Sequence, residues 1–258
     1  MEYQTLLLKK ENGIMELTLN RPAEGNAFNK QMFFDFADAI EECDKDEEVK
    51  VIVVTGAGKH FSVGGDIGEM AKGDFIGFDL GLYAARSINS VRKCSKPVIA
   101  MINGAAAGAG CALALACDFR IFTERGSLLT AFSNVGLSGD CACLYHLYHH
   151  VGLAKTIEMM ALSEPIRIDE IQRLNLATKV VTAETLREET MAFAQKVLGR
   201  PLVAVAMQKK IYNEMFYDDF EQYCRLEAEM LEVTGNTEDH LQAVAAFLEK
   251  RKPVFNHR

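Results

Sequence analysis

The sequence predicts an α/β fold, in which short apolar strands alternate with amphipathic helices. Three observations support this prediction. The chain has 258 residues, 49% of them hydrophobic and 25% charged, a composition typical of a globular protein with a large core. Strand-like and helix-like segments alternate before about residue 152, and helical segments dominate after it. No linker rich in Gly, Pro or Ser separates the two parts.

The first elements establish the alternation. Residues 15–19 alternate between apolar and polar side chains, which predicts a strand with one buried face. Apolar residues at intervals of three and four predict a helix over 30–43. The apolar runs 51–54 and 98–102 predict buried strands, and 118–122 predicts another. Strands separated by helices in this way favour parallel pairing.

The rest of the chain is mainly helical in its pattern. A small-residue stretch at 105–116 predicts a helix after Gly110, and one later strand is expected at 179–181. The further helices are expected over 153–162, 168–174, 184–198, 201–233 and 237–251.

Charge and composition exclude several partners. The formal net charge is −8, so the chain is expected to repel nucleic acid. No apolar run approaches the ~20 residues that cross a bilayer, and the first 20 residues lack a signal-peptide pattern. We therefore expect a soluble, cytoplasmic protein that does not associate with membranes. The seven cysteines are expected to be reduced thiols, because so long a chain folds without disulfides.

Two glycine-rich loops, 61–67 and 103–111, are the first candidate site. Each follows a predicted strand and precedes a predicted helix, so each presents unpaired backbone N–H groups where the helix dipole favours negative charge. Neither loop has the G-x-G-x-x-G spacing of dinucleotide sites, and the chain has no P-loop motif. The alternative interpretation is that these are tight turns that need glycine for packing.

Other catalytic motifs are weak or missing. His146 has helical spacing to His149 and His150, but without H-E-x-x-H an amphipathic interface helix is favoured over a metal site. Cys141 and Cys143 lack C-x-x-C spacing, and no G-x-S-x-G is present. We expect no metal.

Asp140 is the carboxylate of most interest. It directly precedes a segment of apolar helical character, so it is either an N-cap that accepts backbone N–H bonds or a catalytic carboxylate.

Five motifs are spread along the whole chain: Leu19 to Pro22 with Asn26 to Phe28, Phe61 to Met70, Lys96 to Ala100, Asn103 to Asp118, and Ala246 to Arg251. Together they resemble the crotonase superfamily of enoyl-CoA hydratases and isomerases. This resemblance implies a spiral of ββα units, acyl-CoA thioester substrates with no separate cofactor, and a helical C-terminal region that builds a homotrimer or a dimer of trimers. It also implies a core with the CoA-ester site over 1–200 and an oligomerisation region over 201–258.

The resemblance also assigns site residues. The two backbone N–H groups that bind the thioester oxygen are implied at Gly65 and Ala109, where amide dipoles would stabilise an enolate. Lys250 matches a lysine that reaches the CoA of a neighbouring subunit. The substrate-binding positions implied are Ser62, Val63, Gly64, Asp66, Ile67, Gly110, Phe132 and Lys250.

The catalytic carboxylates depart from the hydratases. Ala112 and Phe132 stand where hydratases carry glutamates, and neither side chain can transfer a proton. Asp140 matches the aspartate of phenylacetate-pathway ring isomerases and Δ3,Δ2-enoyl-CoA isomerases, although Gly139 replaces their usual proline.

The sequence therefore predicts an acyl-CoA isomerase. Asp140 would shift a double bond, or rearrange a ring, by moving one proton. The alternatives are an atypical hydratase of a conjugated or cyclic dienoyl-CoA and a CoA-ester binding protein that has lost its catalytic residues.

Overall fold

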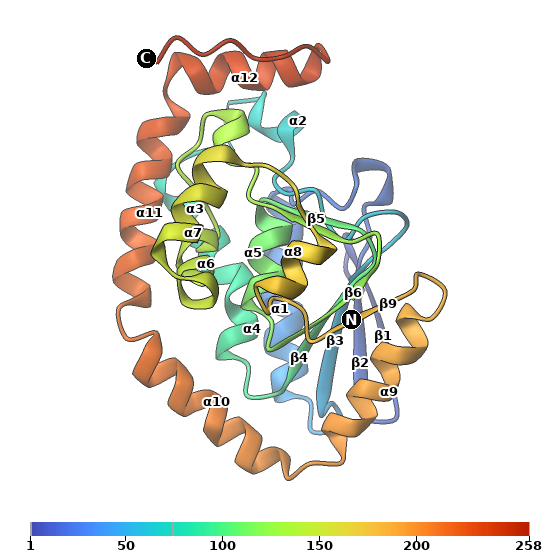
Figure 1. Cartoon of the computed structure of the whole chain (residues 1–258). Helices are drawn as coiled ribbons and strands as arrows, with labels where there is room; N and C mark the ends of the chain where they lie inside the picture. Colours follow the sequence, from blue (N-terminus) through green and yellow to red (C-terminus); the bar gives the residue numbers. More distant parts are fainter. Residues whose placement is uncertain (1, 74, 258) are drawn as a thin grey trace.

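A computed structural model, which describes residues 2–73 and 75–257, shows two sheets covered by helices (Figure 1). Within these residues the larger sheet has six strands in the order β1-β2-β3-β4-β6-β9, and each neighbouring pair except β1 and β2 is parallel. The predicted α/β class and parallel pairing are confirmed. The strands are β1 Leu6–Glu11, β2 Ile14–Leu19, β3 Val51–Gly56, β4 Val98–Ile102, β6 Phe119–Thr123 and β9 Lys179–Val181.

The smaller sheet lies where the predicted glycine-rich loops meet. It pairs β5 (Ala105–Ala107) with β7 (Ser127–Leu129) in parallel, and β7 with β8 (Ile166–Arg167) antiparallel. The segment 103–111 therefore contains a short strand as well as a loop, and the following helix α5 (Ala109–Ala116) begins at Ala109, one residue before Gly110.

Helices bury both faces of the larger sheet. Helix α1 (Lys30–Lys45) begins at an Asn29 cap, whose side chain accepts the Met32 N–H at 2.8 Å. Its apolar stripe and the all-buried α5 belong to the main core, while α9 (Leu186–Leu198) covers the opposite face over β3, β4 and β6. Burial on both faces explains why β3 and β4 are apolar at nearly every position.

The C-terminal helices enclose one end of the molecule. Helix α11 (Phe220–Gly235) packs along α3 (Phe78–Ile88), and α12 (Glu238–Leu248) crosses above α2 (Ile67–Met70), at the top of Figure 1. The other helices are α4 Ser90–Lys93, α6 Cys143–Val151, α7 Leu153–Leu162, α8 Ile168–Arg173 and α10 Leu202–Phe216, with 3-10 turns η1 Pro22–Glu24 and η2 Ser133–Val135.

Two local expectations need correction. The single helix predicted over 201–233 is wrong, because the chain breaks at 217–219 between α10 and α11. The hydroxyl of Tyr145 donates to Asp219 at 2.6 Å, so a contact from a distant part of the chain holds this break. Strand β1 was not predicted, although the Asn-Gly pair after it, with φ of 50° and 80°, is a typical hairpin turn.

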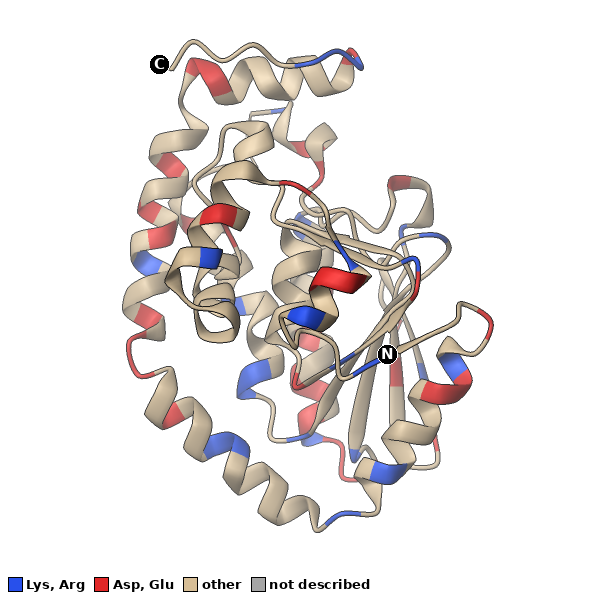
Figure 2. Cartoon of the chain, viewed as in Figure 1, with Lys and Arg blue, Asp and Glu red and all other residues tan. Residues whose placement is uncertain are grey.

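Charged residues are distributed over the helices rather than gathered by sign. Figure 2 shows acidic and basic segments interspersed along α9, α10 and α11.

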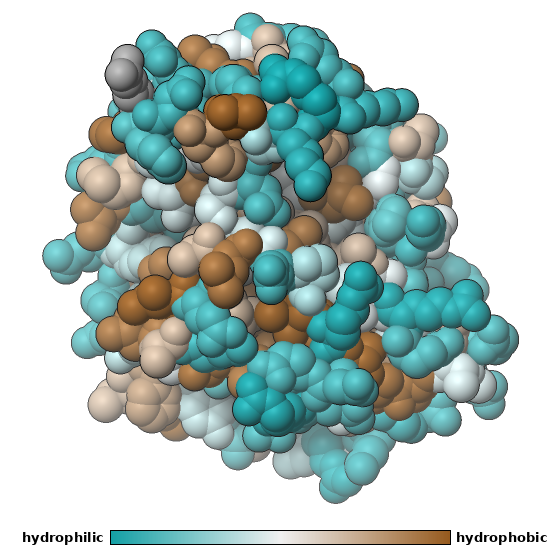
Figure 3. All heavy atoms as spheres, turned by 45° about the horizontal axis from the view of Figure 1, so that its top comes forward, coloured by the Kyte–Doolittle hydropathy of each residue, from teal (hydrophilic) through white to brown (hydrophobic). Residues whose placement is uncertain are grey.

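Large apolar side chains are exposed on α10, α11 and α12, and apolar patches alternate with hydrophilic ones on the face that Figure 3 presents. The exposed apolar residues of these helices are Val203, Met207, Ile211, Tyr212, Met215, Phe216, Leu226, Met230, Val233, Leu241, Phe247 and Leu248.

A buried ammonium group anchors α10 to the core. Lys209 is 6% exposed, and its Nζ donates to the Val91 carbonyl at 2.7 Å, the Lys96 carbonyl at 3.0 Å and Asp118 Oδ2 at 2.7 Å.

Lys209→Met should lower the free energy of unfolding by about 3 kcal/mol, because the partly buried Asp118 carboxylate loses its cation and the Val91 and Lys96 carbonyls lose their donor. Lys210→Met is the matched control, since Lys210 is exposed and its pair with Glu214 contributes little. Chemical denaturation of both variants checks this expectation. Equal stability of the two variants would contradict the anchoring role.

Candidate functional site

The two glycine-rich loops lie against each other. Ser62 and Ala106 form a parallel bridge, and the Ala107 N–H donates to the Ser62 carbonyl at 2.8 Å. Gly64 has a φ of 105°, and a Cβ there would lie 3.1 Å from the Ala107 carbonyl oxygen. A Cβ on Gly110 would lie 2.6 Å from the Ser62 carbonyl oxygen. Glycine is therefore needed at both positions for the backbones to approach this closely.

The backbone N–H groups of Gly65 and Ala109 are the next candidates, because both residues are directly adjacent in the chain to the glycines of this contact. Within the described part of the chain neither N–H donates to a backbone acceptor, and both residues line one large cavity. Ala109 is the first residue of α5, where the helix leaves its N–H unpaired and concentrates positive potential. The two donors can thus serve one negatively charged oxygen.

That cavity has a volume of about 810 Å³ and a mainly apolar wall. Its wall comes from both loops, the segment 129–140, and α12 with the tail after it. The C-terminal region therefore contributes to the site, and the expected division at residue 200 stays a prediction. Of the positions named from sequence, Val63, Gly64, Gly65, Asp66, Ile67, Ala109, Phe132 and Asp140 line the cavity.

Three of the named positions do not line it. Ser62 is buried, and its hydroxyl donates to the Asn26 carbonyl at 2.8 Å and accepts the Gly64 N–H at 3.3 Å, so it shapes the loop. Gly110 provides the close approach described above. Lys250 is exposed beyond the end of α12, whereas its neighbour Arg251 lines the cavity. The role of Lys250 at a neighbouring subunit stays a prediction.

The carboxylates on the cavity wall differ in their partners. Asp66 pairs with the Arg21 guanidinium at 2.8 Å and accepts the Glu69 N–H as the cap of α2. Glu24 is exposed to solvent. Asp140 is partly buried, and its Oδ1 accepts the Cys141 N–H at 2.5 Å. Burial raises the pKa of Asp140 to about 6, and the bond from Cys141 opposes this shift.

Asp140 is not the cap residue of the following helix. Helix α6 begins at Cys143, its cap position is Ala142, and no side chain caps it. The Asp140 carbonyl, rather than its carboxylate, accepts the Cys143 N–H at 3.1 Å. The interpretation of Asp140 as an N-cap, whose carboxylate would accept N–H bonds from the first turn of the helix, is therefore wrong.

A second buried carboxyl group lies next to Asp140 and was missed from sequence. Glu227 on α11 is 8% exposed, and its two oxygens accept the Ala142 N–H at 2.7 Å and the Tyr223 hydroxyl at 2.8 Å. Burial, followed by the charge of Asp140, raises the pKa of Glu227 to about 8. The signal was available, because Glu227 interrupts the apolar stripe of Phe220, Cys224 and Leu231 at helical spacing.

The histidines of α6 make structural contacts. His146 is buried against the side-chain amide of Asn89, and His150 bonds to the Leu115 carbonyl at 3.1 Å. Burial lowers the pKa of His150 to about 4, so this side chain is neutral at pH 7.

Among the described residues no group of three or more His, Cys, Asp or Glu side chains could hold a metal ion. No helix in the described ranges is long and apolar enough to span a bilayer.

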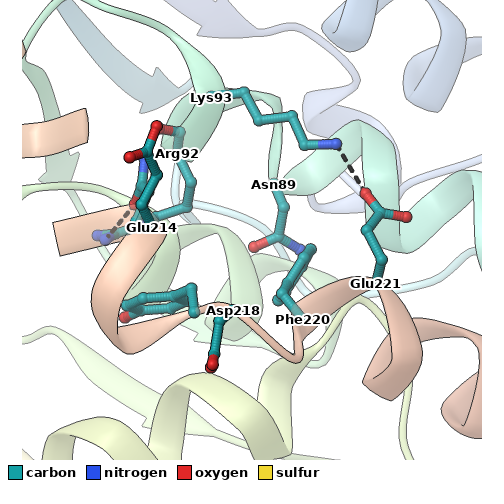
Figure 4. A pocket seen from close by; sticks show the side chains of 9 residues that line it. Asn89, Arg92, Lys93, Glu214, Asp218, Phe220 and Glu221 are labelled. Atoms are coloured by element: carbon teal, nitrogen blue, oxygen red, sulfur yellow. Dashed lines mark hydrogen bonds and ion pairs between the residues drawn. The ribbon is translucent and has the colours of Figure 1, made fainter. Parts of the chain in front are cut away.

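A second cavity of about 400 Å³ lies between α4 and the junction of α10 with α11 (Figure 4). Both of its cationic side chains have partners in the wall: Lys93 pairs with Glu221 at 2.9 Å, and the Arg92 guanidinium lies 4.4 Å from the centre of the Tyr217 ring. Asn89 lies in its wall and donates to the Cys141 carbonyl at 3.2 Å. This wall therefore contacts the turn that carries Asp140.

Asp140→Asn should be at least as stable as the unaltered protein at pH 7. Burial raises the folded-state pKa from 3.8 to about 6, so the cost of burying the charged carboxylate is absent below about pH 4, grows between pH 4 and 6, and is constant above about pH 6. Asp140→Asn, with its neutral amide, avoids this cost. Its melting temperature relative to the unaltered chain should therefore increase between pH 4 and 6. A constant loss of several degrees at every pH would instead support a capping role.

Known proteins are similar in sequence and in fold to this chain over nearly its whole length. Residues 9–258 match the model of the family described as Enoyl-CoA hydratase/isomerase. The crotonyl-CoA hydratase of Syntrophomonas wolfei is 31% identical over 257 residues, which cover 99% of each chain. The 1,2-epoxyphenylacetyl-CoA isomerase of Escherichia coli is 31% identical over 256 residues, 97% of each chain. The crystal structure of an enoyl-CoA hydratase from Mycobacterium avium subsp. paratuberculosis has a TM-score of 0.91 at 27% identity and covers 99% of this chain and 100% of that one.

Proposed function

The chain belongs to the enoyl-CoA hydratase/isomerase family and has its crotonase-type fold, and from this premise we propose that it is an isomerase of enoyl-CoA thioesters. One observation carries the proposal. Asp140, a carboxylate with no ion-pair partner among the described residues, lines the same apolar cavity as the N–H donors of Gly65 and Ala109. Similar proteins include hydratases and isomerases, so the choice between these reactions rests on the site itself.

The two positions that carry hydratase glutamates are apolar here. Ala112 is fully buried within α5, and Phe132 forms part of the cavity wall. Activation of water and delivery of a proton by two glutamates would require carboxyl groups at both positions. An isomerisation needs one group that takes a proton and returns it, and Asp140 can supply that group.

The proposed step moves one proton and one electron pair. The Asp140 carboxylate takes a proton from C2 of a 3-enoyl thioester, and the electron pair delocalises onto the thioester oxygen. Gly65 and Ala109 stabilise that oxygen with their N–H groups. The same carboxyl returns the proton to C4, so the double bond moves to C2–C3 and no atom is gained or lost.

Burial supports this role. The raised pKa of Asp140 makes its carboxylate a stronger base than an exposed aspartate, yet it remains charged at pH 7. The apolar wall around it also lowers the local polarity, which strengthens the interaction of the two N–H donors with a developing charge.

Asp140→Asn should lower the rate of double-bond migration at least about 100-fold, because the amide cannot accept the proton. The assay incubates a panel of enoyl-CoA thioesters in deuterated water. Isomerisation gives a shifted double bond with deuterium exchange, and hydration gives the mass of one added water. Thioester affinity, measured by calorimetry, should change little. Net hydration by the unaltered protein would overturn the proposal in favour of a hydratase, and unaltered turnover in Asp140→Asn would remove Asp140 from the mechanism.

We also propose a homotrimer or a dimer of trimers. The exposed apolar side chains of α10 to α12 exceed the scattered single exposures that need no explanation. Analytical ultracentrifugation should find three or six times the mass of one chain. A species of 28.6 kDa alone at micromolar concentration would contradict this assembly.

A further inference from the structure

The turn that carries Asp140 has an unfavourable backbone conformation. Cys141 and Ala142 are consecutive non-glycine residues with φ of 60° and 57°, in the left-handed region, and Gly139 before Asp140 has a φ of 138°. Side chains with a Cβ rarely adopt the left-handed region, so two in succession persist only where surrounding contacts hold them. The direction of the Asp140 carboxylate depends on this turn.

Contacts from two distant helices hold it. Glu227 on α11 accepts the Ala142 N–H at 2.7 Å, and the Asn89 amide after α3 donates to the Cys141 carbonyl at 3.2 Å. The Tyr223 hydroxyl donates to the other oxygen of Glu227 at 2.8 Å and fixes its orientation. A Cβ on Gly139 would lie 3.8 Å from Glu227 Oε1, so the carboxyl group also lies directly behind the residue before Asp140.

Carboxyl and thiol groups surround Glu227. Asp140 and Cys141 face it from the turn, Cys143 from α6, and Tyr223 and Cys224 from α11 itself. On α3, which packs against α11, the Arg86 guanidinium is paired with Glu221. Burial, followed by the charge of Asp140, raises the pKa of Glu227 to about 8, above that of Asp140 at about 6, so Glu227 is the more readily protonated carboxyl of the two.

We propose that Glu227 is a positioning residue for Asp140: it fixes the left-handed turn through the Ala142 N–H and, as a neutral carboxyl group, leaves Asp140 as the negative charge of the pair. This inference rests on the proposed isomerase function. Ionisation of Glu227 would place a second negative charge beside a site where the enolate also develops negative charge, and this would slow the reaction.

Two variants separate the two parts of this role. Glu227→Gln keeps an oxygen for the Ala142 N–H but cannot ionise, whereas Glu227→Met has similar length and no acceptor. Asp35→Asn is the matched control, because Asp35 is a buried carboxylate on α1 that likewise accepts a backbone N–H and a hydroxyl, both from Thr5.

The pH profile of kcat for deuterium exchange is the main measurement. The unaltered protein should lose activity below about pH 6 and above about pH 8. Glu227→Gln should keep kcat at pH 7 within about threefold. In this variant kcat should no longer fall above about pH 8, because the amide cannot ionise. Glu227→Met should lose at least about tenfold in kcat with KM within about twofold, because a misplaced base reacts slowly. Asp35→Asn should change the melting temperature and leave the profile unchanged. An alkaline limb retained by Glu227→Gln, or an unreduced kcat in Glu227→Met, would overturn the inference.

A ligand-free measurement separates this inference from the proposed function. The carbon-13 resonance of the Asp140 carboxyl, assigned by its loss in Asp140→Asn, should titrate near pH 6 in the unaltered protein and in Glu227→Gln. In Glu227→Met the loosened turn should admit water and move the titration toward 3.8. If no thioester is turned over, the proposed function has failed, but the titration still tests the positioning role of Glu227. An unchanged Asp140 titration in Glu227→Met overturns that role.

Discussion

The close approach of the two glycine-rich loops is the constraint on which the site depends. An N–H donor from each loop can face one oxygen only if the backbones touch, and the Ser62 to Ala106 bridge brings them to that distance. Side chains would prevent this contact. A Cβ on Gly104 would lie 2.1 Å from the Lys59 carbonyl oxygen, closer than the positions of Gly64 and Gly110 already described. The glycines therefore serve backbone packing, and the proposed anion-binding role of the loops depends on that packing.

The second constraint is the low polarity of the cavity wall. Phe132 contributes an aromatic ring to this wall, and Arg21 compensates the charge of Asp66. Among the described residues Asp140 has no ion-pair partner, in contrast to Asp66 on the same wall. Its partial burial makes the charged form costly and so raises its pKa, which makes the carboxylate a stronger base.

Most of the fold could be predicted from sequence because its signals are local. The helix at 153–162 and the strand at 179–181 have the predicted bounds, since their apolar periodicity is uninterrupted. The break before α11 could not be predicted, because the Tyr145 to Asp219 bond that holds it joins segments 74 residues apart. The loop residues of the cavity followed from motifs, whereas Glu227 did not, since its proximity to Asp140 depends on the packing of α11 against α3.

Helix α11 links three parts of the molecule that are far apart in sequence. Its inner face supplies Glu227 to the turn of Asp140 and packs Leu231 against Gly81 of α3, where a Cβ would lie 2.8 Å from the leucine side chain. Its outer face exposes Leu226, Met230 and Val233 to solvent. If a neighbouring subunit covers that outer face, it restrains the same helix from which Glu227 contacts the turn of Asp140. Assembly would then contribute to the geometry of Asp140 without any residue of the neighbour touching the substrate, because a helix packed on both faces has little freedom to shift.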